Sequence, residues 1–214
     1  MEASAYMPKT LSAILITLSL SATAFAQVTV NAVNSGVLDS FQTRYFANLS
    51  AGDGAVNMTN IGALGGFDPT GDICANVYVF SQDQQLAACC TCPLTVNHLT
   101  TLSVQRDLIS NLLTPGVPSA ITVAVIATAE SGGQCNASTV TAAQLVPGLR
   151  VWGTTLHALP AGGYTVAETE FSPGLLSASQ LTKLTQYCGF IQAIGSGYGI
   201  CASCRSGAAG AEKQ

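Results

Sequence analysis

The sequence predicts a mainly β fold: an antiparallel β-sandwich with one C-terminal amphipathic helix, stapled by disulfides. Three observations predict it. About seven or eight short segments rich in β-forming residues are separated by turn signals. In one stretch near the C-terminus, apolar residues recur at spacings of three and four, as on one face of a helix. Eight cysteines follow an apolar leader, which is typical of exported proteins that form disulfides.

The composition excludes several classes of function. The chain has 214 residues with 7 Lys and Arg and 11 Asp and Glu, and only 8% of its residues are charged. An average globular domain has about 25% charged residues. So few basic residues exclude a charge-driven nucleic-acid binder, because counterion release needs several Lys or Arg on one face. The low charge also excludes a coiled coil, which needs charges beside its apolar seam.

Residues 1–26 are predicted to be a secretory signal peptide. Lys9 precedes an apolar run over 11–20, and Ala24-Phe25-Ala26 forms a small-x-small cleavage site. No second run of about 18 apolar residues follows, so we expect no membrane span in the mature chain. We therefore expect a secreted protein, extracellular or periplasmic. The predicted domains are a sandwich with its helix over 27–195 and a Gly/Ala/Ser-rich tail over 196–214.

The strand candidates combine β-branched or aromatic residues with alternating apolar positions. Ile121–Ala127 is almost continuously apolar, which predicts a buried strand. Ile73–Phe80 and Leu86–Cys92 are predicted to form a hairpin across a polar turn. Segment 39–49 suits a strand or a short helix, and Gly62–Asp72 is predicted to be a loop. Further strands are predicted at 28–33, 55–62, 94–104, 149–156 and 164–171, with one or two helical turns at 106–113.

One helix is predicted after Ser177. Ser177 and Gln180 form a capping-box pattern, in which the Ser hydroxyl accepts a backbone N–H and the Gln side chain reaches back. Gly195 can end the helix in a left-handed conformation. We expect the helix to pack on an edge or an end of a sheet. Its apolar face consists of Leu181, Leu184, Cys188 and Ile191.

The cysteines are Cys74, Cys89, Cys90, Cys92, Cys135, Cys188, Cys201 and Cys204. Their even number in an exported chain predicts disulfides. On a strand, Cys89 points to one face and Cys90 and Cys92 to the other. The predicted hairpin places Cys74 opposite the 89–92 cluster, which allows a cross-strand bridge. A bridge from Cys201 or Cys204 to that cluster would staple the tail to the sheet, and Cys135 would then join Cys188.

Zinc binding or a redox-active CxxC motif is the alternative for these cysteines. Cys201 and Cys204 have zinc-ribbon spacing, but the extra Cys90 prevents 89–92 from being a matching second unit. A thioredoxin-like motif would lie near the start of a βαβ unit, and the sequence predicts no such unit there. An oxidising compartment favours disulfides, so we expect no metal and no cofactor.

Several motifs occur together at fixed spacing along the mature chain. They are Val56–Gly62, Ile73–Phe80, Cys89–Thr95, Trp152–His157 and Gly197–Cys204. In these motifs the chain resembles an uncharacterised family of exported bacterial Cys-rich proteins. The resemblance covers most of the mature chain and implies export and a bacterial source, but no activity.

The sequence offers few groups for catalysis. Hydrolysis needs a nucleophile, a base and an orienting group, and His98 and His157 are the histidine candidates for the base. No GxSxG motif is present. Glu168 and Glu170 lie two apart on a predicted strand and share one face, as glycosidase carboxylates would, although a solvated strand face is the more ordinary role. Glu130 stands alone in a predicted loop, and no catalytic residue is assigned.

Two further groups of residues suggest binding. Asp68 and Asp72 lie in one loop and could supply oxygen ligands for Ca²⁺, although a plain turn is favoured because no known calcium-loop pattern is present. Trp152, Tyr164 and Phe171 fall on neighbouring predicted strands, where they could form a platform that stacks on sugars. Core packing is the more ordinary role of such aromatic residues.

These observations favour a secreted structural or binding module of the bacterial cell exterior that is not catalytic. The reasons are the polar, uncharged surface and the scarcity of candidate bases. The first alternative is a self-assembling surface or filament subunit whose strand at 28–33 pairs with an open sheet edge of a neighbour. The second is an extracellular hydrolase that uses His157 or Glu168. The expected partner is a second copy or a cell-surface polymer.

Overall fold

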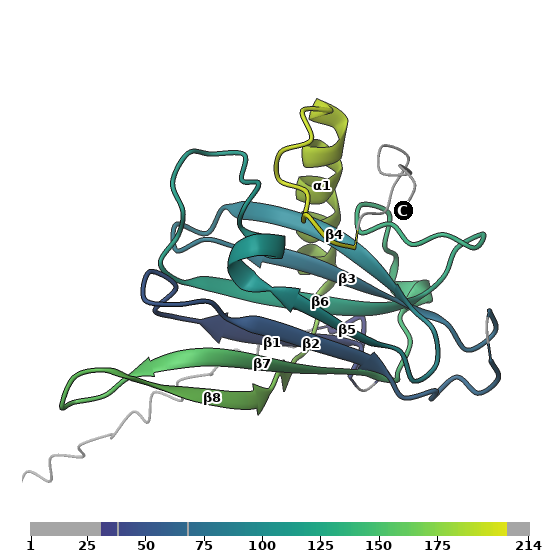
Figure 1. The fold of residues 1–214 in the computed structure, drawn as a ribbon. Coiled ribbons are helices and arrows are strands. Elements are labelled where there is room, and N and C mark those ends of the chain that lie inside the picture. The colour runs from purple at the N-terminus through teal and green to yellow at the C-terminus, as the bar shows by residue number, and fades with distance from the viewer. Residues whose placement is uncertain (1–30, 38, 68, 205–214) are drawn as a thin grey trace, which may run out of the picture.

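A computed structural model, which describes residues 31–37, 39–67 and 69–204, consists of two packed antiparallel sheets and one long helix (Figure 1). The first sheet has the strand order β4 (Leu86–Leu94), β3 (Ile73–Phe80), β6 (Ile121–Ala129), β1 (Phe41–Phe46) and β9 (Ser172–Pro173). The second has the order β5 (Leu99–Ser103), β2 (Ala55–Asn60), β7 (Leu149–Ala158) and β8 (Tyr164–Glu170). Helix α1 spans Ala178–Ile194, and the helical turns η1 and η2 span Val104–Leu108 and Ala142–Gln144. The predicted sandwich with a C-terminal helix is confirmed.

The main hydrophobic core lies between the two sheets. Successive side chains of a strand point to opposite faces, so every second residue of β3 and β6 enters this core. Val77 and Val125 enter it from the first sheet, and Met58 and Val151 from the second, all with no exposed surface. Residues between them on β3 and β6 point away from the core, and most of these are buried as well. The outer face of the first sheet must therefore be covered.

Helix α1 covers that outer face, and the expectation that it packs on a sheet edge or end is wrong (Figure 1). Its predicted apolar face packs in a second core with Tyr78, Ala124 and Ile126, which are the outward residues of β3 and β6. The predicted ends are confirmed, because the Ser177 hydroxyl accepts the Gln180 N–H at 3.1 Å and Gly195 is left-handed. The two-sided apolar character of β3 and β6 decides where the helix lies.

Three segments take a form that the sequence left open or placed differently. Segment 39–49 contains strand β1, because side chains on both of its faces are buried. Segment 94–104 is divided by a turn in which the His98 N–H donates to the Thr95 carbonyl, so β5 begins only at Leu99. The helical turn expected at 106–113 lies earlier, at η1, which has π-helical geometry.

The N-terminal strand predicted at 28–33 lies mostly outside the described residues. Within the described part, Ala32 forms an isolated bridge with Ser177, and the Val33 N–H donates to the Leu176 carbonyl at 2.7 Å. No helix of the described chain is long and apolar enough to cross a membrane.

Four disulfides join the eight cysteines, and the predicted stapling of the tail is confirmed. Cys90 bonds to Cys201 and Cys92 bonds to Cys204, so both tail cysteines are fixed to the inner face of β4. Cys89 points to the opposite face, as expected from its adjacent position.

Two pairings differ from those the sequence suggested. Cys89 bonds to Cys188, because α1 lies over the outer face to which Cys89 points. Cys135 therefore bonds to Cys74 and not to Cys188. A cross-strand bridge from Cys74 is also wrong: its direct neighbour on β4 is Pro93, so no cysteine stands opposite it. These pairings depend on the position of the helix, which the cysteine spacing does not reveal.

Candidate functional site

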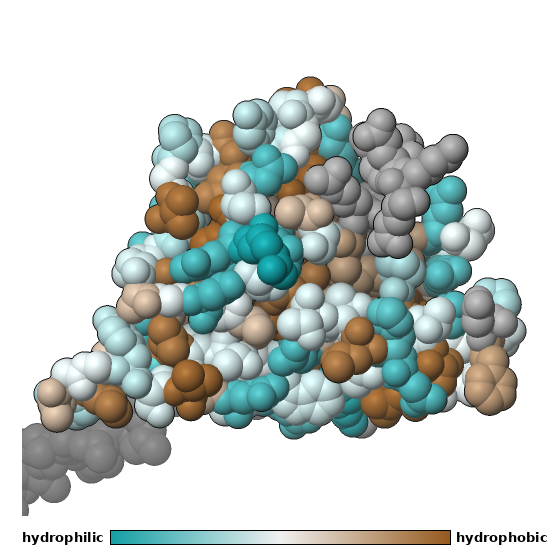
Figure 2. Space-filling view, viewed as in Figure 1, coloured by the Kyte–Doolittle hydropathy of each residue, from teal (hydrophilic) through white to brown (hydrophobic). Residues whose placement is uncertain are grey.

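An apolar groove of about 550 Å³ opens between the second half of α1, the β3–β4 turn and the loop at 111–118. Its volume lies within the range of roughly 300–1,000 Å³ that is common for small-molecule sites. Figure 2 shows exposed apolar side chains at the upper left, where this loop approaches β4 and α1. The lining residues are Ser81, Gln84, Gln85, Leu86, Ala87, Leu112, Leu113, Thr114, Gly116, Pro118, Tyr187, Phe190 and Ile191.

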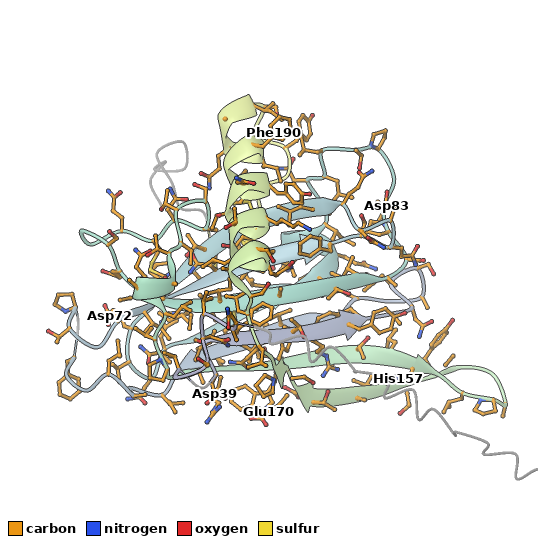
Figure 3. All side chains as sticks on the ribbon, turned by 180° about the vertical axis from the view of Figure 1, so that it is seen from behind. Asp39, Asp72, Asp83, His157, Glu170 and Phe190 are labelled. Carbon is orange, nitrogen blue, oxygen red and sulfur yellow. A yellow bond between two sulfur atoms is a disulfide. The ribbon has the colours of Figure 1, made fainter. Side chains whose placement is uncertain are left out.

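The helix contributes an apolar stripe that its packing on the sheet does not use. Tyr187, Phe190 and Ile194 follow one another at spacings of three and four, so they lie along one side of α1. They are 47%, 66% and 45% exposed, whereas Ile191 beside them is buried. Figure 3 shows Phe190 near the C-terminal end of the helix. Tyr187 and Phe190 therefore form an exposed aromatic wall above the buried floor at Ile191.

The opposite wall is tied to the C-terminal tail through Asn111. Its side-chain amide donates to the carbonyls of Gly197 at 2.6 Å and Ile200 at 3.2 Å, and its own carbonyl accepts the Gly199 N–H at 2.6 Å. Gly199 has φ +75°, and a Cβ at this position would lie 2.9 Å from Ile191 and 3.0 Å from Leu113. Only glycine fits there, so the loop, the tail and the helix hold one another in place.

A buried carboxylate in η1 anchors the same tail. Asp107 is 4% exposed, and its carboxylate accepts the Ser103 N–H at 2.7 Å and the Ser203 hydroxyl at 2.8 Å. Its backbone carbonyl accepts the Ala202 N–H at 2.8 Å. Burial alone would raise the pKa of Asp107, but hydrogen bonds from Arg106, Ser203 and Ser103 outweigh burial and lower this pKa below its ordinary value. The carboxylate therefore stays ionised at neutral pH, and Asp107 holds Ala202 and Ser203 of the tail to η1.

The rim of the groove is polar but carries no charge. Ser81, Gln84 and Gln85 come from the β3–β4 turn, and all the lining residues are uncharged. Asp83 lies in the same turn but does not line the groove; a hydrogen bond from Ser81 lowers the pKa of Asp83. The groove therefore offers an apolar floor, aromatic contacts and neutral hydrogen-bonding groups.

The residues considered for hydrolysis do not form one site. His157 stands opposite Thr165 on β8, whereas Glu168 stands opposite Thr154, so the two side chains point to opposite faces of the sheet. In the part of the chain that the structure describes, neither His98 nor His157 has a side-chain hydrogen bond or ion pair that would orient the ring. Figure 3 places His157 and Glu170 at different positions along the β7–β8 hairpin.

The cysteine clusters offer no thiolate for a metal or for redox chemistry in this oxidised chain. Every cysteine of the 89–92 and 201–204 motifs is in a disulfide, and none of the described cysteines is free. Cys74, Glu130 and Cys135 bring ligand atoms within 4.8 Å of one another. The two sulfurs are bonded to each other, however, and cannot act as thiolates.

The expected calcium loop lies partly outside the described residues, and the fold divides the expected aromatic platform. Asp68 lies outside the described residues, and Asp72 is buried. Phe171 is a core residue that meets Phe46 edge to face, with 6.0 Å between the ring centroids. Trp152 stands opposite Glu170 at one end of the β7–β8 ladder, and Tyr164 stands at the other end, so the expected platform of three aromatic residues does not form.

The groove is a site that the sequence analysis missed. The available signal was the stripe of Tyr187, Phe190 and Ile194, which broadens the apolar side of α1 beyond the face that covers the sheet. No family model, curated protein or solved structure matches the chain. The candidate site therefore depends on geometry and chemistry alone.

Proposed function

We propose that the protein is a secreted, non-catalytic binding module of the bacterial cell exterior, and that its groove takes an uncharged, mainly apolar small molecule. The four disulfides indicate that the chain folds in an oxidising compartment. The observation that supports binding is the groove itself: about 550 Å³, with one exposed aromatic wall and no charged residue in its lining.

The chemistry of the lining supports this class of ligand. Tyr187 and Phe190 offer large apolar contact areas with little side-chain entropy to lose. Gln84 and Gln85 can hydrogen-bond a neutral polar end of the ligand. A charged ligand would lose its hydration in the groove and gain no opposite charge, which is unfavourable. Because the walls are tied together through the tail, little ordering is needed on binding.

Titration with N-phenyl-1-naphthylamine, a neutral apolar dye, tests the proposal. The dye should bind saturably, with a fluorescence increase, to the mature protein. In Phe190→Ser the dissociation constant should rise by about tenfold or more, since losing a buried aromatic contact costs on the order of 1.5–3 kcal/mol. Phe190 is exposed in the free protein, so the fold should persist, which circular dichroism can check.

Leu175→Ser is the matched control. Leu175 is 67% exposed and Phe190 is 66% exposed, but Leu175 lies before α1 and outside the groove. The control should bind the dye as the parent protein does. An equal loss in both variants, or a fluorescence increase that never saturates, would show that the dye senses exposed apolar surface in general and would overturn the groove as a site.

A further inference from the structure

Strand β8 is an open edge of the four-stranded sheet. It pairs with β7, and within the described residues no strand pairs with its other side. Six of its seven residues are exposed, including Tyr164 at 51% and Val166 at 65%. The β7–β8 hairpin extends beyond the rest of the sandwich (Figure 1), with apolar side chains exposed along it (Figure 2).

The β7–β8 ladder determines which backbone groups point to the open edge. The Phe171 N–H donates to Val151 at 2.8 Å and the Leu159 N–H donates to Gly163 at 3.0 Å, which mark hydrogen-bonded positions of the ladder. Such positions alternate along an antiparallel pair. Thr165, Ala167 and Thr169 therefore direct their backbone groups toward β7. The residues that direct an N–H and a C=O to the open edge are Tyr164, Val166, Glu168 and Glu170.

Two other sheet edges are covered by the chain itself. The Cys89 N–H of β4 donates to the Gly199 carbonyl at 2.9 Å, so the tail lies along that edge. The edge of β1 is covered by the short strand β9, and the Phe41 carbonyl of β1 accepts a hydrogen bond from the Gly174 N–H. Edge strands left open are templates for pairing with another chain. Strand β5, the fourth edge, also has one strand partner among the described residues, but it has only five residues. β8 is the longer open edge, with seven residues, and it projects from the body (Figure 1).

We propose that β8 is an assembly edge that pairs antiparallel with β8 of a second copy, with Ala167 at the two-fold axis. This register uses the whole strand, because Ala167 is its middle residue. Val166 then stands opposite Glu168, and Tyr164 opposite Glu170, so all outward backbone groups find partners. No two like charges stand directly opposite, whereas a register centred on Glu168 would oppose two carboxylates. The four-stranded sheets of the two copies then form one continuous sheet. This pairing does not involve the groove.

The proposal also predicts how charge affects pairing. In this register the two Glu168 side chains are diagonal neighbours, so their repulsion weakens the dimer. Glu168 accepts a hydrogen bond from the Asn57 side chain at 3.2 Å, which Gln can also accept at this position. Glu168→Gln should therefore lower the dimer dissociation constant about twofold to tenfold, and added salt should act in the same direction.

Cysteine cross-linking tests the register in the full mature chain. Across the new interface, Ala167 would face its own copy in a non-hydrogen-bonded pair with Cα atoms about 4.5 Å apart, which a disulfide can span. Ala167→Cys should give a covalent dimer under mild oxidation, seen by intact mass with the four native disulfides retained. Thr165→Cys is the matched control, because Thr165 would face Thr169 of the second copy and should not cross-link.

A proline variant tests the edge itself. The Val166 N–H points away from β7, so Val166→Pro blocks the open edge but removes no hydrogen bond of the hairpin. Sedimentation equilibrium should find a dimer for the parent protein and for Val166→Thr, and a monomer for Val166→Pro. A monomeric parent protein, a dimeric Val166→Pro variant or equal cross-linking of both cysteine variants would overturn the proposal. Open-ended filaments would overturn it too, because two-fold pairing closes.

Discussion

At the scale of single residues, polar side chains join segments that are distant in the sequence. Asn60 is 1% exposed, and its amide donates to the Gly71 and Leu94 carbonyls at 2.8 and 3.0 Å. The Tyr78 hydroxyl donates to the Ala137 carbonyl at 2.6 Å, and burial raises the pKa of Tyr78 far above its ordinary range, so the ring stays neutral. Each such group is buried only because a partner satisfies it. Asp107 is a charged member of this set.

Asp107→Asn should lower the free energy of unfolding at neutral pH by about 1.5–3 kcal/mol, the usual contribution of hydrogen bonds to a charged group. The folded-state pKa of Asp107 is lowered, so its carboxylate stabilises the fold fully above the unfolded value of roughly 4. This contribution is lost as the pH falls through the folded-state pKa. The difference from the parent protein should therefore shrink in acid, which urea unfolding at several pH values can measure.

Asp83→Asn provides the control for this experiment. Asp83 is a fully exposed carboxylate in the β3–β4 turn, where solvent screens its interactions. Its replacement should leave the free energy of unfolding almost unchanged at every pH. If Asp107→Asn behaved in the same way, the buried hydrogen bonds of Asp107 would not stabilise the tail as described.

At the scale of elements, α1 is held to the sheet by a small apolar core and one covalent bond. Leu184 and Cys188 of the helix are completely buried against the outer face of the first sheet. The Cys89–Cys188 disulfide closes a loop with a sequence separation of 99. A long closed loop removes much entropy from the unfolded chain. The groove depends on this contact, because α1 supplies one of its walls.

Replacing Cys89 and Cys188 together by Ala should lower the free energy of unfolding by about 2–5 kcal/mol. Hydrogen exchange should show faster opening of the α1 amides, because the helix loses its covalent link to β4. The matched control replaces Cys74 and Cys135 together by Ala. This change releases the loop around Cys135 and leaves the disulfide between α1 and β4 intact. If exchange in α1 increased equally in both double variants, the helix would not be held mainly through Cys89.

At the scale of the whole molecule, the β3–β4 hairpin is the hub of the covalent framework. Each of the four disulfides has one end on this hairpin, and the other ends lie later in the chain. The sequence separations are 61, 99, 111 and 112, so the unfolded chain is constrained over most of its described length. A loop, the helix and the tail are all fixed to one rigid element.

The intact mass of the purified protein should show this framework directly. Alkylation without reduction should add no label, because none of the described cysteines is free, and alkylation after reduction should add eight labels. The same mass should place the N-terminus at Gln27 if the predicted leader is removed. Label added before reduction would mean that at least one disulfide is absent from the purified protein, and a mass that includes residues 1–26 would contradict the leader.

The sequence by itself determined several local features of this protein. The boundaries of α1 follow from Ser177 and Gly195, and the opposite orientations of Cys89 and Cys90 follow from strand geometry. The buried strand β6 follows from its almost continuously apolar sequence, which is typical of a strand buried on both faces. These features depend on a few neighbouring residues, so the local pattern contains the information that they need.

Only the tertiary structure decided which distant segments meet. The partners of Cys74 and Cys89, the position of α1 over a sheet face and the groove all require the relative placement of elements tens of residues apart. Many such placements are compatible with the same local pattern. The choice is made by burying both faces of β3 and β6 at once, and this free energy belongs to the assembled core rather than to any one segment.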